Sequence, residues 1–134
     1  MARYFNREEA EALLPAITIM LQAIQRHRRE TVRVEETLAR LRLKTISNGH
    51  NLQQPLFEAQ RELAEHVEAL RTTLSELEAS GCVLKDPEMG LIDFLSLREG
   101  REVCLCWHLG EERINYWHTL EAGFAGRQSL DEEA

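Results

Sequence analysis

The sequence predicts an α+β fold, in which a long antiparallel helical hairpin is followed by a small antiparallel β-meander. In residues 6–80, apolar side chains recur at alternating steps of three and four, the coiled-coil-like spacing of packed helices. From Gly81 onward, β-branched, aromatic and Cys residues form short segments between turn signals, which is typical of strands. A chain of 134 residues, 43% of them hydrophobic, suits one domain with a core. We therefore expect a single domain over 1–134, with the hairpin in 6–80, the sheet in 82–122, and a loop with a loose acidic tail in 123–134.

The first helix is expected to begin after Asn6, because an Asn side chain can cap exposed N–H groups and Glu9 follows three residues later. Pro15 either bends this helix or starts a second one, since its ring removes a donor and clashes with the preceding turn. We expect a bend near Pro15. The apolar seam continues to Leu41, and the Gly and Asn residues of "SNGHN" should end the helix.

The second helix carries its apolar seam from Leu56 to Leu77 and is expected to end at Gly81, which readily adopts a left-handed C-cap. A short loop between two long helices makes them antiparallel. Apolar residues beside the seams, such as Leu43, Phe57 and Ala64, widen the stripe beyond what one partner helix covers. We therefore expect a homodimer in which two hairpins form a four-helix bundle.

Three strands are expected in the sheet, near residues 91–97, 102–109 and 114–120, because turn signals at "DPEMG", "REG" and "GEER" flank them. One face of this sheet should pack on the helices. The tail "SLDEEA" should be loose and solvated.

Composition and charge exclude several classes of partner. A net charge of −7 argues against nucleic acid, since that affinity depends on basic residues that release counterions. No apolar run approaches the roughly 20 residues that cross a membrane, and the N-terminal segment lacks the apolar core of a signal peptide. The odd set of Cys82, Cys104 and Cys106 is read as reduced thiols. We therefore expect a cytoplasmic protein, with no nucleic-acid or membrane partner.

The β region holds a candidate metal or acid/base site, because carboxylates and imidazoles bind divalent metals and transfer protons near neutral pH. The candidate catalytic residues are Asp93, Glu111, His118 and Glu121, and the candidate metal ligands are Asp93, His118 and Glu121. Their spacing matches no recognised metal motif. A two-residue "REG" turn would place Asp93 opposite Cys106 with His108 on the same face, whereas a longer turn would separate them. The alternative is that these side chains only form local hydrogen bonds and cap turns.

Three other features have a structural and a functional interpretation. The thiols of "CLCW" are interpreted as small buried hydrophobic groups rather than nucleophiles. Arg127 in "GFAGRQ" is a candidate anion-binding residue, with a turn in which it pairs to a local acid as the alternative. The basic segment "RHRRETVRVEETLARLRLK" is a candidate surface for nucleic acid or an acidic protein, with neutralisation by the acidic second helix within a bundle as the alternative.

The order of segments "FNREEAEALLP", a charged hairpin, "LKDPEMGLIDF", "REVCLCWHLGE" and "YWHTLEAGFAGRQ" resembles the bacterial and archaeal family catalogued as domain of unknown function 2203. The resemblance covers nearly the whole chain and is most specific in the C-terminal half. The sequence departs from the family pattern at His108 and Cys104. The polar positions shared with the pattern are Asp86, Asp93, Glu111, His118, Glu121 and Arg127. The resemblance implies no known activity, substrate or cofactor.

The sequence therefore predicts a non-catalytic structural or interaction module that dimerises through its helices, with a further protein partner possible. The alternative is a hydrolase-like enzyme with a carboxylate and histidine site in the β region, using a divalent metal or acid/base groups.

Overall fold

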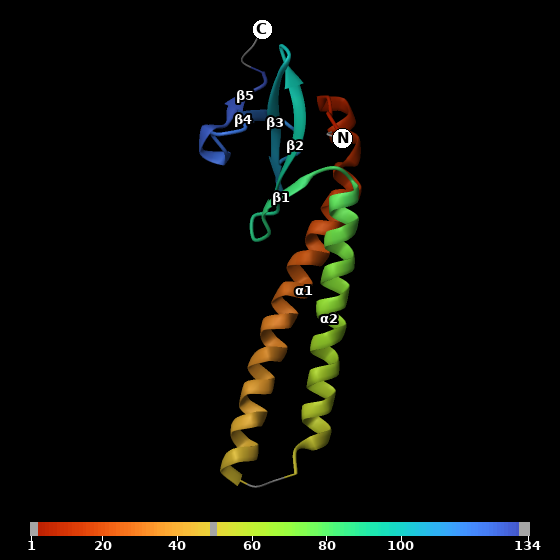
Figure 1. Ribbon diagram of the computed structural model, residues 1–134, viewed down its shortest axis with the longest axis vertical. Coiled ribbons are helices and arrows are strands. Elements are labelled where there is room, and N and C mark those ends of the chain that lie inside the picture. The colour runs from red at the N-terminus through yellow and green to blue at the C-terminus, as the bar shows by residue number, and fades with distance from the viewer. Residues whose placement is uncertain (1–2, 49–50, 132–134) are drawn as a thin grey trace. The chain divides into compact units, whose positions relative to one another are not determined.

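The computed structural model describes residues 3–48 and 51–131, and its elements confirm the predicted α+β class (Figure 1). The elements are the helices α1 (Arg7–Asn48) and α2 (Gln53–Ala79), the strands β1 (Val83–Asp86), β2 (Leu91–Arg98), β3 (Arg101–His108), β4 (Tyr116–Thr119) and β5 (Gln128–Ser129), and the 3₁₀ turn η1 (Phe124–Gly126). The strands form one sheet in the order β1-β2-β3-β4-β5, and every neighbouring pair is antiparallel. The predicted meander is therefore confirmed.

The chain divides into two compact units, each described here by itself. The sheet unit contains residues 3–22 and 75–131, and so includes the first turns of α1, the end of α2 and all five strands. The hairpin unit contains residues 23–74, with the remaining parts of both helices. A single domain over 1–134 stays a prediction.

Helix α1 begins with the capping arrangement that the sequence predicts. The side-chain oxygen of Asn6 accepts a hydrogen bond from the backbone N–H of Glu9 at 2.7 Å, and the Glu9 carboxylate accepts one from the N–H of Asn6 at 2.9 Å. The helix then continues through Pro15 to Asn48. A second helix starting at Pro15 is thus wrong, whereas the bend there stays a prediction. In these described residues neither helix has an apolar stretch that could span a membrane.

Helix α2 ends where Gly81 adopts a left-handed backbone conformation. Gly81 has a φ of 102°, in the left-handed region, and its N–H donates to the carbonyl of Glu78 at 3.0 Å. A Cβ at Gly81 would also collide with the ring of Phe5, so a larger residue is excluded by both conformation and space. The predicted loop between the helices includes residues 49–50, which lie outside the described residues.

The strand pair β2–β3 sets the register of the sheet. Glu99 and Gly100 form a two-residue turn with φ values of 53° and 79°, as in a type I′ hairpin. The shorter of the two turns considered from the sequence is therefore present, and Asp93 lies opposite Cys106. The rings of Phe94 and Phe5 meet edge-to-face, with centroids 5.1 Å apart, at the core of this unit.

Two strands and one turn were not expected from the sequence. The four-residue β1 pairs with β2 across a register irregularity, and the two-residue β5 pairs with β4. Strands this short show no clear alternation, so periodicity does not reveal them. The 3₁₀ turn η1 lies in the segment predicted as a loop, and β5 extends to Ser129, the first residue of the predicted loose tail. There, the N–H of Leu130 donates to the carbonyl of Asn115 at 2.8 Å, and Asp131 pairs with Arg7 at 3.1 Å.

Candidate functional site

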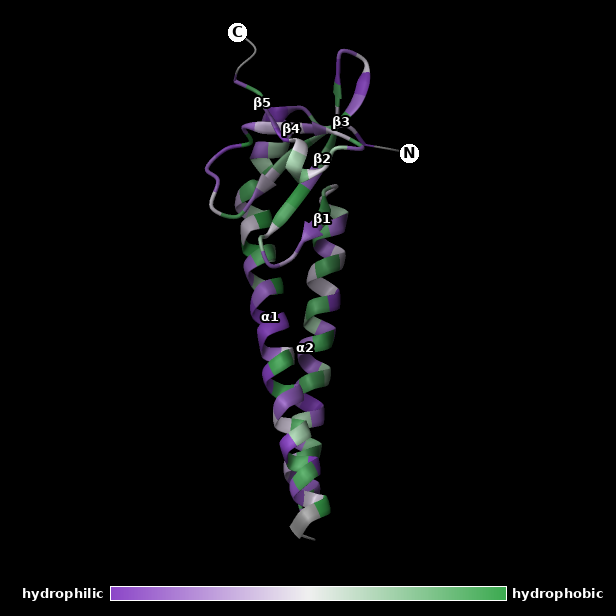
Figure 2. Ribbon diagram, turned by 90° about the vertical axis from the view of Figure 1, so that its left-hand side faces the viewer, coloured by the Kyte–Doolittle hydropathy of each residue, from purple (hydrophilic) through white to green (hydrophobic). Residues whose placement is uncertain are grey.

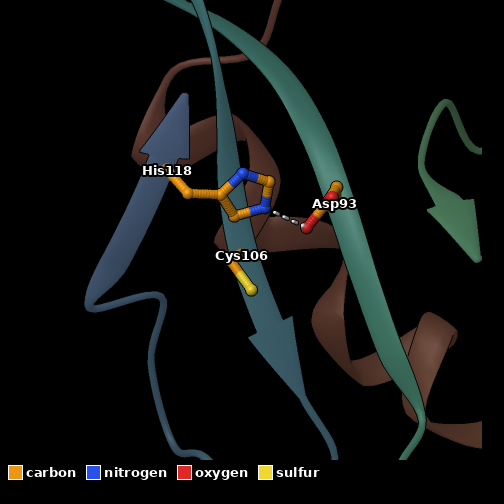
Figure 3. Close-up of side chains that lie close together, drawn as sticks. All are labelled: Asp93, Cys106 and His118. Carbon is orange, nitrogen blue, oxygen red and sulfur yellow. Dashed lines mark hydrogen bonds and ion pairs between the residues drawn. The ribbon is translucent and has the colours of Figure 1, made fainter. Parts of the chain in front are cut away.

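Three side chains from three neighbouring strands converge in the sheet unit: Asp93 on β2, Cys106 on β3 and His118 on β4 (Figure 3). Their exposed fractions are only 4%, 1% and 2%. One carboxylate oxygen, the sulfur and one ring nitrogen all lie within 4.8 Å of one another. Among the described residues, these three are the side chains of ligand type that lie close enough together to hold a metal ion. We call these three residues the Asp–Cys–His cluster.

The register of the sheet brings these residues together. Asp93 lies directly opposite Cys106, and His118 lies opposite Cys104, which is two residues from Cys106 on the same strand. Residues two apart on a strand point to the same face, so all three side chains share one face of the sheet. The cluster therefore depends on the two-residue turn of the β2–β3 hairpin.

Both ring nitrogens of His118 face oxygen atoms. Nδ1 lies 2.8 Å from the carbonyl oxygen of Thr119, which can only accept, so Nδ1 carries a hydrogen and donates it. Nε2 lies 3.1 Å from Oδ1 of Asp93. A hydrogen bond between these two atoms needs one further proton, on Nε2 or on the carboxyl group. The ring is thus fixed in orientation, with Nε2 directed at the carboxylate.

Cys106 is a poor nucleophile in this environment. Burial, and then the neighbouring Asp93 carboxylate, raise the pKa of the Cys106 thiol to about 12. Burial also raises the pKa of the thiols of Cys82 and Cys104. Neither ring nitrogen of His118 is directed at the sulfur by a hydrogen bond, because both have oxygen partners. The cluster therefore lacks the activated thiol of a cysteine enzyme.

The candidate residues Glu111 and Arg127 lie together in the sheet unit, where Nη2 of Arg127 also donates to the backbone carbonyl of Cys106 at 3.4 Å. Nη2 of Arg127 donates to both carboxylate oxygens of Glu111, at 2.7 and 2.8 Å, and its guanidinium stacks 4.0 Å above the ring of Tyr116. The Glu111 carboxylate also accepts a hydrogen bond from the backbone N–H of His108 at 3.0 Å. Arg127 is therefore paired with a local acid, the alternative to anion binding that the sequence left open.

Glu121 is exposed and does not join the cluster. It lines an open cleft of about 450 Å³ together with Arg98, Arg101, Glu102 and Trp117. Asp86, another polar residue of the C-terminal half, accepts a hydrogen bond from the N–H of Glu88 at 2.9 Å and so stabilises a turn. Of the four candidate catalytic residues, the structure therefore brings together only Asp93 and His118.

Cys106 is the member of the cluster that the sequence interpretation left out of the site. A signal was present, because a two-residue turn at "REG" places Asp93 and Cys106 opposite each other. The sequence did not decide between this two-residue turn and a longer one. A burial argument alone assigns Cys106 to the core, and the structure shows that it is both buried and next to two metal-ligand side chains.

Two histidines, His27 and His66, lie side by side in the hairpin unit. Nδ1 of His27 and Nδ1 of His66 are 3.0 Å apart, so one ring donates and the other accepts. Burial, followed by the positive charges of His66 and Arg26, lowers the pKa of His27. These two rings have no third ligand-type side chain close enough to complete a metal site among the residues that the structure describes.

Comparison with family models finds one described as "Uncharacterized conserved protein (DUF2203)", which matches residues 3–130. The match confirms the resemblance stated from the sequence. None of the curated proteins and none of the solved structures compared with the chain gives a significant match.

Proposed function

The chain belongs to the DUF2203 family, whose description names no activity, and we propose that it is a non-catalytic interaction module that forms a homodimer through its helical hairpin. The observation that supports this proposal is the amount of apolar surface on the hairpin unit. Six large apolar side chains there are 37–81% exposed: Val32, Leu43, Ile46, Phe57, Val67 and Leu74. Large apolar side chains exposed in this number on one unit favour an interaction surface.

The exposed residues follow coiled-coil spacing on each helix. On α1, Val32, Ala39, Leu43 and Ile46 are separated by steps of seven, four and three. On α2, Phe57, Ala64, Val67 and Leu74 are separated by steps of seven, three and seven. Steps of this kind keep side chains on one face of a helix, as in a seam that packs against another helix. Figure 2 shows hydrophobic and hydrophilic residues alternating along both helices.

These seams are distinct from the one that closes the hairpin. Within the hairpin, Val34, Leu38 and Ala59 are buried, and Leu41, Leu56 and Leu63 pack against them. Each helix therefore has one apolar seam covered by its partner and a second one exposed to solvent. A second pair of helices would cover the exposed seams, as in a four-helix bundle.

Charge favours a second copy of this chain as the partner. The α1 segment 23–48 carries seven Arg and Lys residues against three Glu, whereas α2 carries six Glu against two Arg. A two-fold symmetric pair of hairpins in which α1 of one copy lies beside α2 of the other would bring opposite charges together twice. Within one hairpin, Arg33 already pairs with Glu62 in this way.

The alternative enzyme function has less support. Its four candidate residues Asp93, Glu111, His118 and Glu121 do not converge, since Glu111 is paired with Arg127 and Glu121 is exposed on an open cleft. Among the described residues, neither Glu111 nor Glu121 is therefore placed beside His118 to accept a proton from a bound water.

Sedimentation equilibrium at micromolar concentrations tests the dimer. We expect a mass of about 31 kDa, twice the 15.5 kDa of one chain. Val32→Glu and Val67→Glu each place a charge on an exposed seam, and each should return the mass to that of one chain. Their exposed fractions of 55% and 39% mean that the fold of one chain tolerates the change.

Leu97→Glu is the matched control, because Leu97 is 51% exposed but lies on β2 in the sheet unit. This variant should keep the dimer mass. A wild-type protein that stays at 15.5 kDa at all concentrations would contradict the proposal, as would a dimer that both seam variants leave intact.

A further inference from the structure

We propose that the Asp–Cys–His cluster binds one divalent metal ion of the zinc class, with Oδ1 of Asp93, Sγ of Cys106 and Nε2 of His118 as its protein ligands. This inference does not depend on the proposed dimer, because the cluster lies wholly within the sheet unit. It differs from the metal site expected from the sequence by replacing Glu121 with Cys106.

The distances within the cluster suit a tetrahedral ion. Zinc is held at about 2.0–2.1 Å by nitrogen and oxygen and at about 2.3 Å by sulfur, which places ligand atoms roughly 3.3–3.6 Å apart. Nε2 of His118 and Oδ1 of Asp93 are 3.1 Å apart, and the sulfur lies within 4.8 Å of both. Binding of an ion would therefore draw the sulfur toward the other two ligand atoms, from within 4.8 Å to the roughly 3.3–3.6 Å of a tetrahedral site.

The histidine is already oriented as a metal ligand. Histidines that bind a metal through one ring nitrogen usually donate the other N–H to a carbonyl or carboxylate, which fixes the tautomer and the ring plane. In this protein Nδ1 of His118 donates to the carbonyl of Thr119 at 2.8 Å, leaving Nε2 directed toward Asp93. Figure 3 shows the ring of His118 directed at Asp93, with Cys106 beside them on the strand between.

The chemistry of the ligand set selects the class of ion. Thiolate and imidazole are ligands for zinc and other late transition metals, whereas Mg²⁺ and Ca²⁺ prefer sets made of oxygen. Bound carboxylate and thiolate carry two negative charges, which a divalent cation neutralises in a site with exposed fractions of 4% or less. A fourth position remains for water, since the described residues supply three ligands. The ion would tie β2, β3 and β4 together.

Elemental mass spectrometry of tag-free protein, refolded with Zn²⁺ and then dialysed, tests the stoichiometry. We expect roughly one zinc per chain in the wild type and about a tenth of that or less in Cys106→Ala and His118→Ala. The matched controls are Cys104→Ala and His108→Ala. Cys104 is a thiol on the same strand, and Nδ1 of His108 lies 2.8 Å from the Leu109 carbonyl, as Nδ1 of His118 does with Thr119. Both controls should keep the zinc.

X-ray absorption at the zinc edge of the wild-type protein tests the ligand set without any variant. One sulfur at about 2.3 Å and nitrogen or oxygen ligands at about 2.0–2.1 Å would support the cluster. A protein that retains no zinc after refolding in its presence would overturn the proposal. So would a site without sulfur, or zinc that the cluster variants keep and the control variants lose.

Discussion

The sheet unit and the hairpin unit differ in which side chains they bury and which they expose to solvent. The sheet unit encloses Phe5, Phe94 and Ile114 at 1% exposure or less, and it also buries the polar side chains of Asp93 and His118. Among the described residues of the hairpin unit, four hydrophobic residues are buried, Ile24, Val34, Leu38 and Ala59, while six large apolar residues are exposed. A central strand has neighbours on both edges, whereas a helix in a two-helix hairpin is covered on one side. The polar groups that could bind a ligand are therefore buried in the sheet unit, whereas the hairpin unit exposes apolar side chains that could bind another helix.

Two spectroscopic probes separate the units. Both tryptophans of the chain, Trp107 and Trp117, lie in the sheet unit, so tryptophan fluorescence reports on its unfolding. Far-ultraviolet circular dichroism is dominated by the helices, most of whose residues lie in the hairpin unit. Urea unfolding followed by both probes tests each prediction on the unit to which it belongs.

The largest effect is expected from breaking the buried pair of the sheet unit. His118→Ala leaves Asp93, which is 4% exposed, without its partner 3.1 Å away. Leaving one member of a buried hydrogen-bonded pair without its partner costs about 1–3 kcal/mol, and more where the remaining group is charged, because that group stays buried and unsatisfied. The fluorescence transition in urea, measured without added metal, should shift to lower concentration by that free energy.

His108→Ala is the control for this prediction. His108 also lies near a carboxylate, with Nε2 3.6 Å from Glu111, but its side chain is 28% exposed. Its loss should cost less than about 1 kcal/mol, since partly exposed pairs contribute little. Equal losses in the two variants would show that the sheet unit does not depend on its buried polar pair, and the contrast between the units would fail.

The contrast between the units also explains how far the sequence predicts this molecule. Long helices follow from periodicity, their ends from Asn6, Glu9 and Gly81, and the β2–β3 hairpin from its turn residues. The cluster could not be predicted from the sequence alone, because its assembly depends on the length of one turn and on the register of three strands. Sequence spacing cannot decide whether Glu121 or Cys106 completes a site with Asp93 and His118. The register of the sheet decides it.

An intermediate effect is expected at the start of α1. Asn6→Ala removes the side-chain acceptor that lies 2.7 Å from the N–H of Glu9, and loss of such a cap costs about 1 kcal/mol. Because Asn6 lies in the sheet unit, the fluorescence transition should record the loss. Glu8→Ala is the control, since Glu8 is an exposed acid in the same first turn and should change stability by only a few tenths of a kcal/mol. A cap variant as stable as this control would show that the predicted helix start contributes nothing.

The smallest effect is a pH dependence that belongs to the hairpin unit. Burial and the charges of His66 and Arg26 lower the pKa of His27 in the folded protein, so folding favours its neutral ring. The contribution is therefore complete above the unfolded pKa of about 6.5 and is lost as the pH falls through the lower folded value. Protonation of both rings would also place two donors at Nδ1 atoms that are 3.0 Å apart. Between about pH 7 and pH 5, the circular dichroism transition should lose less than about 1 kcal/mol, because the pair is partly exposed.

His27→Gln should remove this part of the pH dependence, and His66→Gln should remove only part of it, because burial of His27 remains the larger cause of its lowered pKa. The comparison is made on the difference between each variant and the wild type, since other carboxylates of the chain also titrate near pH 5. A His27→Gln protein with an unchanged pH profile would show that the histidine pair has no role in the stability of the hairpin unit. The effect at His118 should exceed that at His27, because water is excluded more completely around the buried His118 than around the half-buried His27.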